Sequence, residues 1–201
     1  MRIAAIGSGH IGGTLGSLWT AKGHQVMFSS RNPQSDRMQA LLSAAGHTAQ
    51  VGTVQEAFDF GEVILLAIPP DGVEQILREA GDLHQKILIN STNRFDGKSA
   101  GMEVIRLAKN ARVVRAFNSL PWEILLNPQF GPTNVSMFIT GDDPAAKEVV
   151  AQLCHDIGLD PVDAGDSANI PHLETAFGLL WKVLMPKFGR DFGFRLLRRE
   201  G

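Results

Sequence analysis

The chain has 201 residues, of which 44% are hydrophobic and 20% are charged, and its formal net charge is −2. This length and composition are typical of one soluble domain, or of one domain with a small extension, that can bury its own core. The near-neutral charge argues against general nucleic-acid binding. Because no apolar run is long enough to cross a bilayer and Met1 leads directly into the first expected strand, we expect a cytoplasmic protein with no membrane association.

Cys154 is the only cysteine in the sequence, so no disulfide can form within the chain. Its neighbours Val150, Leu153 and Ile157 recur at helical spacing, which predicts a buried packing role rather than a nucleophile. No His/Asp or Cys/His constellation stands out in the sequence. We therefore expect no metal site and no catalytic acid or base.

The first 32 residues predict a βαβ unit. Residues 2–6 read as a short apolar strand, a glycine-rich segment over 7–13 follows, and a helix then leads to a second strand over 25–28. Gly7 allows the tight turn off the strand, Gly9 has no Cβ to block a pyrophosphate, and Gly12 lets the helix pack closely on the sheet. The free N–H groups and the positive end of the helix dipole then face an anion. The predicted dinucleotide loop comprises Gly7, Ser8, Gly9, His10, Ile11 and Gly12, and a glycine-rich turn kept only as part of the fold is the alternative.

The tip of the second strand indicates which dinucleotide is bound. An NAD site usually places Asp or Glu there, which accepts hydrogen bonds from the ribose 2′-hydroxyl and would repel a 2′-phosphate. This chain has Ser29, Ser30, Arg31 and Asn32 instead. Two hydroxyls, a guanidinium and an amide suit a phosphate dianion, so the segment predicts NADP, unless Arg31 only solvates the strand end. Asp36 is nearby but is expected to cap or decorate the next helix.

The rest of the chain alternates strands and helices. Continuous apolar runs over 62–68 and 86–89 predict strands that are covered on both faces, as in a parallel sheet. The expected fold class is α/β, a Rossmann-type doubly wound, mainly parallel sheet with a short C-terminal helical extension. Further strands are expected at 48–51, 112–116, 135–141 and 160–165, and further helices at 35–46, 54–60, 71–81, 100–109 and 142–157.

Ligands of open α/β sheets lie outside the carboxyl ends of the strands, and two neighbouring strand ends carry candidates. Ala67, Ile68 and Pro69 end one strand, where Ile68 and Pro69 could contact the ribose or the nicotinamide. The cluster from Asn90 to Asn93 ends the next strand. Its hydroxyls and amides could meet a ligand, but the same residue types also form turns with their own backbone.

A third strand end, after residues 112–116, carries Asn118 and an apolar segment. Asn118 is a candidate orienter of the nicotinamide carboxamide or of a substrate carbonyl. Leu120, Pro121 and Trp122 could form an apolar wall against a flat ring. Packing in the core is the alternative for Trp122.

The last stretch predicts a helix over 170–184, with Leu173, Phe177 and Leu180 on its inner face. His172 and Glu174 lie in its first turn, where a solvated helix start is preferred over contact with a substrate. Residues 186–201 are rich in basic side chains, and phenylalanines or leucine recur every four residues. This pattern predicts an amphipathic tail that packs on a partner subunit or borders an anionic ligand, with a solvated helix face as the default.

Several of these stretches together resemble the NADPH-dependent coenzyme F420 reductase family, whose nucleotide domain also occurs in the six-transmembrane metalloreductases. The matching stretches are Gly7 to Gly12, Ser30-Arg31-Asn32-Pro33, Ala67-Ile68-Pro69, Ser91-Thr92-Asn93, Ala116-Phe117-Asn118 and residues 160–165. The resemblance implies that Gly9 to Gly12 meet the pyrophosphate and that Ser30 and Arg31 meet the 2′-phosphate. It also implies that Ile68, Pro69 and Asn118 line the nicotinamide side, with Asn93 nearby.

The resemblance further implies an NADP-dependent reductase that passes a hydride directly between NADP(H) and a second redox ring, a deazaflavin of the F420 type or a flavin. Such a transfer needs positioning rather than an acid or a base. The alternatives are an NADPH-dependent reductase of ferric chelates or other small molecules and a non-catalytic NADPH sensor. We expect an NADP-binding domain over 1–165, a helix and basic tail over 166–201 that pack on it or on a partner subunit, a small-molecule redox acceptor and a homodimer.

Overall fold

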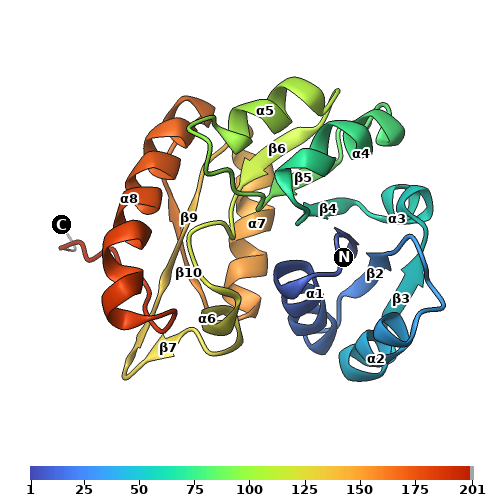
Figure 1. Ribbon diagram of the computed structural model, residues 1–201, viewed down its shortest axis with the longest axis horizontal. Helices are drawn as coiled ribbons and strands as arrows, with labels where there is room; N and C mark the ends of the chain where they lie inside the picture. Colours follow the sequence, from blue (N-terminus) through green and yellow to red (C-terminus); the bar gives the residue numbers. More distant parts are fainter. Residues whose placement is uncertain (200–201) are drawn as a thin grey trace.

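In the computed structural model, which describes residues 1–199, the chain forms a parallel sheet with helices on both faces (Figure 1). The central sheet has six strands in the order β3-β2-β1-β4-β5-β6, and every pairing within it is parallel. Its strands are β1 (Arg2–Ile6), β2 (Gln25–Ser29), β3 (Ala49–Gly52), β4 (Val63–Leu66), β5 (Ile87–Asn90) and β6 (Arg112–Arg115). This strand order, with crossovers on both faces, confirms the predicted Rossmann-type fold.

The two faces of the sheet are separated by the alternation of side chains along each strand. Ile3 and Ala5 of β1 face a core covered by α1 (His10–Ala21), α2 (Asp36–Ala45) and α7 (Pro144–Asp156). Ala4 and Ile6 face a second core under α3 (Val54–Phe60), α4 (Val73–Ala80) and α5 (Ala100–Leu107). Because both faces are buried, the strands read as continuous apolar runs.

Two further strands extend this architecture beyond β6. The short strands β9 (Ser136–Ile139) and β10 (Asp160–Asp163) pair in parallel. Arg115 and Thr140 exchange two backbone hydrogen bonds in an isolated antiparallel bridge, which joins the end of β9 to the end of β6. Along the chain, the segment between β6 and β9 contains the short helix α6 (Trp122–Leu126) and the hairpin of β7 (Gln129–Phe130) and β8 (Thr133–Asn134). These elements were not predicted from the sequence.

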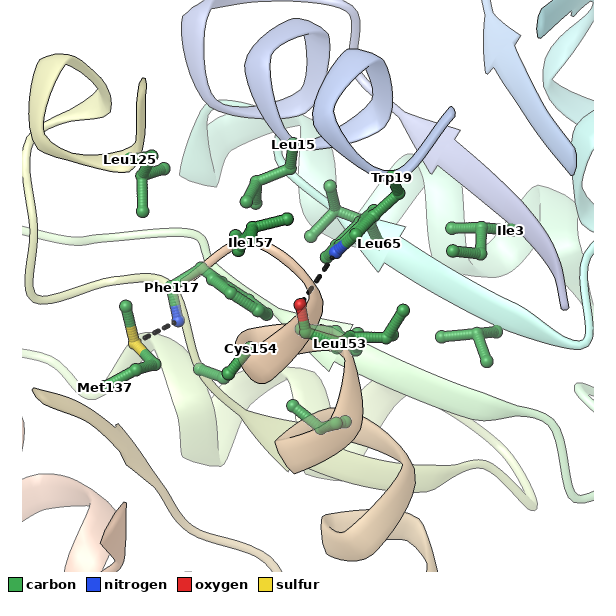
Figure 2. Close-up of a cluster of buried hydrophobic side chains, with 14 of the residues drawn as sticks. Ile3, Leu15, Trp19, Leu65, Phe117, Leu125, Met137, Leu153, Cys154 and Ile157 are labelled. Carbon is green, nitrogen blue, oxygen red and sulfur yellow. Dashed lines mark hydrogen bonds between the residues drawn. The ribbon is translucent and has the colours of Figure 1, made fainter. Parts of the chain in front are cut away.

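The larger of the two cores connects α1 near the start of the chain with α7 (Figure 2). The indole Nε1 of Trp19 donates a hydrogen bond of 3.0 Å to the carbonyl of Leu153, so α1 is fastened to α7. Phe117 packs edge-on against Trp19, with ring centroids 5.6 Å apart. Cys154 is fully buried beside Leu153, which confirms the predicted packing role, and burial raises the pKa of its thiol.

The C-terminal helix differs from its prediction in length and in the residues that it buries. Helix α8 (Ile170–Phe188) continues past Pro186, two residues before its end, and stops at Gly189, whose φ is +65°. Phe177 is buried as expected, whereas Leu180 is 41% exposed. No helix within residues 1–199 is both long and apolar enough to span a membrane.

The predicted helical tail is wrong beyond Phe188 for the residues that the structure describes, while residues 200–201 of that prediction lie outside them. Residues 190–199 have no helical structure, and residues 194–196 pass the start of β9. The carbonyl of Phe194 accepts a 2.7 Å hydrogen bond from the Ser136 N–H, and Phe192 and Phe194 pack against Trp181 and Phe177 of α8. The spacing of two residues between these phenylalanines fits an extended chain, so the tail covers the domain itself.

Candidate functional site

The carboxyl ends of β1, β4, β5 and β6 are held together by short polar contacts. The N–H of Ala67, just after β4, donates to the carbonyl of Ile6 at the end of β1, over 2.9 Å. The Ser91 and Thr92 hydroxyls, just after β5, donate to the carbonyls of Leu66 and Ile68 over 3.0 and 3.1 Å. The predicted strand-end residues therefore lie along one edge of the sheet.

The glycine loop at this edge has the shape that a pyrophosphate requires. Gly7 has a φ of +102°, and a Cβ there would lie 2.3 Å from the Ala67 carbonyl oxygen. A Cβ on Gly12 would lie 1.8 Å from the Gly7 carbonyl oxygen, so both glycines are needed for packing. At Gly9, in contrast, a Cβ would meet nothing within 4 Å among the described residues. The loop thus leaves an open cradle at Gly9, directly before α1.

The start of α1 fits an anion in this cradle. Gly9 caps the helix without a side chain, and the first turn, which begins at His10 and Ile11, contains no acidic residue. The first backbone N–H groups of a helix have no partner within the helix, and they carry the positive end of its dipole. The residues present therefore fit the pyrophosphate of a dinucleotide.

The four residues of the predicted 2′-phosphate segment lie at and directly after the end of β2, and their side chains differ in burial and in hydrogen bonding. The buried Ser29 hydroxyl accepts a 3.2 Å hydrogen bond from the Gly7 N–H, so it is aimed at the glycine loop. The Ser30 hydroxyl accepts from the Asn32 N–H over 3.1 Å, which shapes the turn. Arg31 and Asn32 are exposed at the tip.

Arg37 is a candidate site residue that was not predicted from the sequence. It lies in the first turn of α2, and its Nη2 donates a 2.8 Å hydrogen bond to the Ser8 carbonyl. The exposed guanidinium therefore lies beside the glycine loop. Its position in the first turn of the helix that follows the Arg31 tip was the available signal. The neighbouring Asp36 is exposed in the same helical turn, as expected.

At the other end of the edge, Asn93 and Asn118 are brought together. The Asn93 Nδ2 donates a 2.9 Å hydrogen bond to the Asn118 carbonyl. Ile68 is half-buried and Pro69 exposed on the neighbouring strand end. Asn90, in contrast, accepts from the Thr92 N–H with its own side chain, which confirms the turn-forming alternative for that residue.

The backbone between β6 and Asn118 is unusual. Phe117 has a φ of +58°, a conformation that bulky L-residues rarely adopt. Its ring is held in the core, and its N–H donates to the Met137 sulfur over 3.1 Å. Strained backbone of this kind persists only where the surrounding packing fixes it, and it often occurs at functional sites. Here it turns the chain so that Asn118 follows the strand end at the site.

The predicted apolar wall is only partly present. Leu120 is 4% exposed and Pro121 is buried, so both belong to the core rather than to a ligand-facing wall. Trp122 is half-buried and stacks on His10 of the glycine loop, with centroids 4.9 Å apart and planes at 15°. An aromatic pair therefore lies beside the start of α1.

Arg115 and Glu174 form a buried ion pair that was not predicted from the sequence. Arg115 is 3% exposed, and its Nη2 lies 2.9 Å from Glu174 Oε1 in α8. The preference for a solvated position is therefore wrong for Glu174, whereas His172 is exposed. Burial lowers the pKa of Arg115 to about 10, which leaves the guanidinium charged at neutral pH. No group of three or more His, Cys, Asp or Glu side chains within residues 1–199 could hold a metal ion.

The chain is similar to several known proteins. Residues 2–94 match the family described as NADP oxidoreductase, coenzyme F420-dependent. The metalloreductase STEAP3 of Rattus norvegicus is 29% identical over 192 residues, which cover 90% of this chain and 38% of that protein. The chain therefore spans about two fifths of the length of this curated relative.

Solved structures show the same fold. A putative F420-dependent NADP-reductase from Arthrobacter sp. FB24 superposes with a TM-score of 0.87 at 23% identity, covering 98% of this chain and all of that one. The hypothetical protein SMa0349 from Sinorhizobium meliloti gives 0.77 at 26% identity, with 99% and 96% covered. A reductive aminase from Aspergillus terreus in complex with NADPH gives 0.73 at 17% identity, with 93% and 63% covered. The predicted family resemblance is confirmed, and the matched region includes the glycine loop, the Arg31 tip and the Asn93 strand end.

Proposed function

We propose, from the match of residues 2–94 to a family of NADP-dependent oxidoreductases, that this chain binds NADP(H) along the carboxyl edge of its sheet and transfers a hydride to a second redox ring. The observation that carries this proposal is the open cradle at Gly9 beside the exposed Arg31 and Arg37. We propose a deazaflavin of the F420 type as the acceptor, with a flavin as the nearest variant.

The order of groups along the edge assigns a direction to the cofactor. The pyrophosphate would meet the N–H groups at the start of α1, and the adenosine 2′-phosphate would meet Arg31 and Asn32, with Arg37 alongside. A guanidinium supplies several donors and a charge to a phosphate, and the tip has no carboxylate to repel it. The nicotinamide would then lie toward Ile68, Pro69, Asn93 and Asn118.

The residues at the nicotinamide end are suited to positioning. The bound nicotinamide would supply the hydride chemistry. The Asn118 side chain has no hydrogen-bond partner within residues 1–199, so its amide is available to orient a carboxamide. Ile68 and Pro69 offer an apolar surface that excludes water. Holding two rings at reacting distance in a dry site accounts for much of the catalysis of a direct transfer, with no side chain acting as acid or base.

A reductase of ferric chelates or other small molecules is the second candidate, and the similarity to STEAP3, a metalloreductase, favours it. That similarity covers 38% of the relative, so it supports the NADPH-binding part of such a function rather than the whole activity. A non-catalytic NADPH sensor is the third candidate. It would bind the cofactor tightly and reduce none of these acceptors.

The test is anaerobic mixing of the protein with NADPH and one acceptor at a time: oxidised deazaflavin, FMN or a ferric chelate, with NADH in place of NADPH as the control. We expect rapid bleaching of the deazaflavin with NADPH and much slower bleaching with NADH. Reduction of the ferric chelate alone would replace the first candidate by the second. NADPH binding without reduction of any acceptor would support the sensor.

We also propose that the partner of this chain is a second copy, bound through the outer face of α8. Leu179, Leu180 and Val183 are 59%, 41% and 71% exposed. Leu179 and Val183 lie on the side of the helix opposite to the buried Ile170 and Phe177, and Leu180 lies on its flank. These fractions leave roughly 300 Å² of apolar surface, close to the apolar share of the smallest specific interfaces, which bury about 600 Å² per partner. A single helix face that contacts its own copy closes a symmetric dimer.

Light scattering on a size-exclusion column tests this surface. The wild type should elute as a dimer, and Val183→Glu should elute as a monomer because it places a charge in the centre of the contact. Met102→Glu, which changes a 40% exposed side chain of α5 in the same way, should stay dimeric. A monomeric wild type, or dissociation by both variants alike, would refute the proposed contact.

A further inference from the structure

We propose that Arg115 and Glu174 form a positioning pair that fixes Asn93 and Asn118 at the nicotinamide end of the site. Through this pair, the N-terminal part of α8 becomes part of the cofactor-binding machinery. The inference rests on the proposed function for the identity of the ligand. The arrangement of the protein groups can be tested without it.

The Arg115 guanidinium is the centre of a buried polar cluster at the ends of β5 and β6. Nη1 donates to the carbonyls of Asn90 and Thr92, over 3.0 and 2.6 Å. Nη2 donates to Asn93 Oδ1 over 2.9 Å and lies at the same distance from Glu174 Oε1. One side chain therefore contacts the last residue of β5 and two residues of the segment that follows it.

This contact determines which way the Asn93 amide faces. A guanidinium has donors only, so the amide oxygen must point toward Arg115 and the NH₂ group must point away. The NH₂ group is thereby directed to the Asn118 carbonyl, 2.9 Å away. If the amide were turned over, its NH₂ group would face a cation and its oxygen would face a carbonyl. Arg115 thus sets both the orientation of Asn93 and the position of the Asn118 backbone.

Glu174 in turn keeps the guanidinium in place. Its Oε1 forms the ion pair with Arg115 and accepts a 2.9 Å hydrogen bond from the Gly101 N–H at the start of α5. The carboxylate therefore joins α8, α5 and β6. A Cβ on Gly101 would lie 2.4 Å from Ile170 Cγ2, so this glycine is what allows α8 to approach closely enough for the contact.

The stability of the fold does not explain a charged pair at this place. Removing two charges from water costs several kcal/mol per ion, and well-packed apolar residues are often as stable or more stable. The cluster also contains the buried atoms of residues 1–199 that have no protein partner, namely Arg115 Nε, Glu174 Oε2 and Thr140 Oγ1. Thr140 lies directly opposite Arg115 in the antiparallel bridge, so their side chains share a face.

The experiment compares the two halves of the cofactor. Adenosine 2′,5′-bisphosphate probes only the phosphate end, whereas NADPH probes the whole site. In Glu174→Gln and Arg115→Met we expect the affinity for the bisphosphate to stay within about twofold and the affinity for NADPH to fall by about tenfold, which is the cost of losing one hydrogen bond to the nicotinamide end. The fluorescence of bound NADPH should also change, because it reports on the surroundings of the nicotinamide.

Arg112→Met is the matched control. Arg112 begins the same strand and pairs with Asp143 over 2.6 Å, at the edge of the sheet away from the site. This variant should leave the binding and the fluorescence of both ligands unchanged. Equal losses of both ligands in Glu174→Gln, or no loss of NADPH affinity, would overturn the proposal. If Arg115→Met does not fold, Glu174→Gln, which keeps a similar shape, carries the test.

The side-chain amide resonances of Asn93, assigned with Asn93→Asp and recorded without cofactor, separate this proposal from the proposed function. We expect them to shift in Glu174→Gln and to be unaffected in Arg112→Met. If they do not move, the pair does not position Asn93. If they move but the wild type binds neither NADPH nor the bisphosphate, the positioning role stands and the proposed function fails.

Discussion

Replacing Arg31 by alanine should convert the chain from one that prefers NADPH to one that distinguishes poorly between NADPH and NADH. Arg31 is exposed at the tip of β2, where removal of its side chain leaves the fold intact. A hydrogen bond to a charged group contributes about 1.5–3 kcal/mol, which corresponds to a loss of about 10- to 100-fold in affinity. NADH has no 2′-phosphate, so its affinity should change by less than about twofold.

Titration of the protein fluorescence with each cofactor measures both affinities, and the wild type, Arg31→Ala and Arg37→Ala form the series. Arg37 also bonds to the Ser8 carbonyl, so Arg37→Ala should weaken NADPH and, to a smaller extent, NADH. Raising the salt concentration should reduce the preference of the wild type for NADPH. If Arg31→Ala weakens both cofactors equally, or neither, the assignment of this tip to the 2′-phosphate is refuted.

Three further predictions follow from the local structure. Gly9→Ala should keep the thermal stability of the wild type but lose most NADPH affinity. A Cβ on Gly12 would lie 1.8 Å from the Gly7 carbonyl oxygen, so Gly12→Ala should lower the free energy of unfolding by about 2 kcal/mol or more. Thermal melts and NADPH titrations in which the two variants behave alike would contradict this prediction. Hydrogen bonding from Arg112 lowers the pKa of Asp143, so the stabilisation from this carboxylate is present above the unfolded pKa near 4 and is lost as the pH falls. Between pH 7 and pH 3, urea unfolding should show a smaller loss of the free energy of unfolding for Asp143→Asn than for the wild type. An equal loss would contradict this prediction. Because Cys154 is fully buried and its thiol pKa is raised, a thiol reagent should modify it only at the rate of unfolding, and fast labelling of the native protein would show that the helix α7 core is open.

The sequence was sufficient for the central sheet because its signals are local. The runs in β4 and β5 are apolar apart from Asn90, which is the pattern of strands covered on both faces. The structure confirms β4 with shorter bounds than predicted and β5 with bounds shifted by one residue. The glycine loop was equally readable, since Gly7 and Gly12 have roles that only a residue without a Cβ can fulfil. The apolar runs and the glycine spacing can each be recognised in a short stretch of sequence.

The parts that could not be predicted depend on contacts between distant residues. Arg115 belongs to a strand with the sequence Arg-Val-Val-Arg, which does not indicate which of the two arginines is buried. In the structure Arg112 is partly exposed, and Arg115 is buried against Glu174. The partner that decides this difference lies in another helix, far along the chain. No periodicity of the strand itself contains that information.

The tail shows a different limit, because two spacings compete in it. Phe188, Phe192 and Leu196 recur every four residues, as in a helix, whereas Phe192 and Phe194 alternate as in an extended chain. Gly189 ends α8, and a Cβ on Gly193 would lie 2.4 Å from the Val135 side chain, so the tail can lie flat against the start of β9. Tertiary packing therefore selects the extended form over the helical one.

The measurement that tests the central claim most directly is the fate of the hydrogen at C4 of NADPH. The protein is mixed anaerobically with NADPH that carries deuterium at one of the two C4 positions and with oxidised deazaflavin, and the reduced deazaflavin is examined by mass spectrometry and NMR. Direct transfer between two held rings predicts that the deuterium from one C4 position, and not from the other, appears in the product. Deuterium lost to water, or taken from both positions alike, would contradict the account.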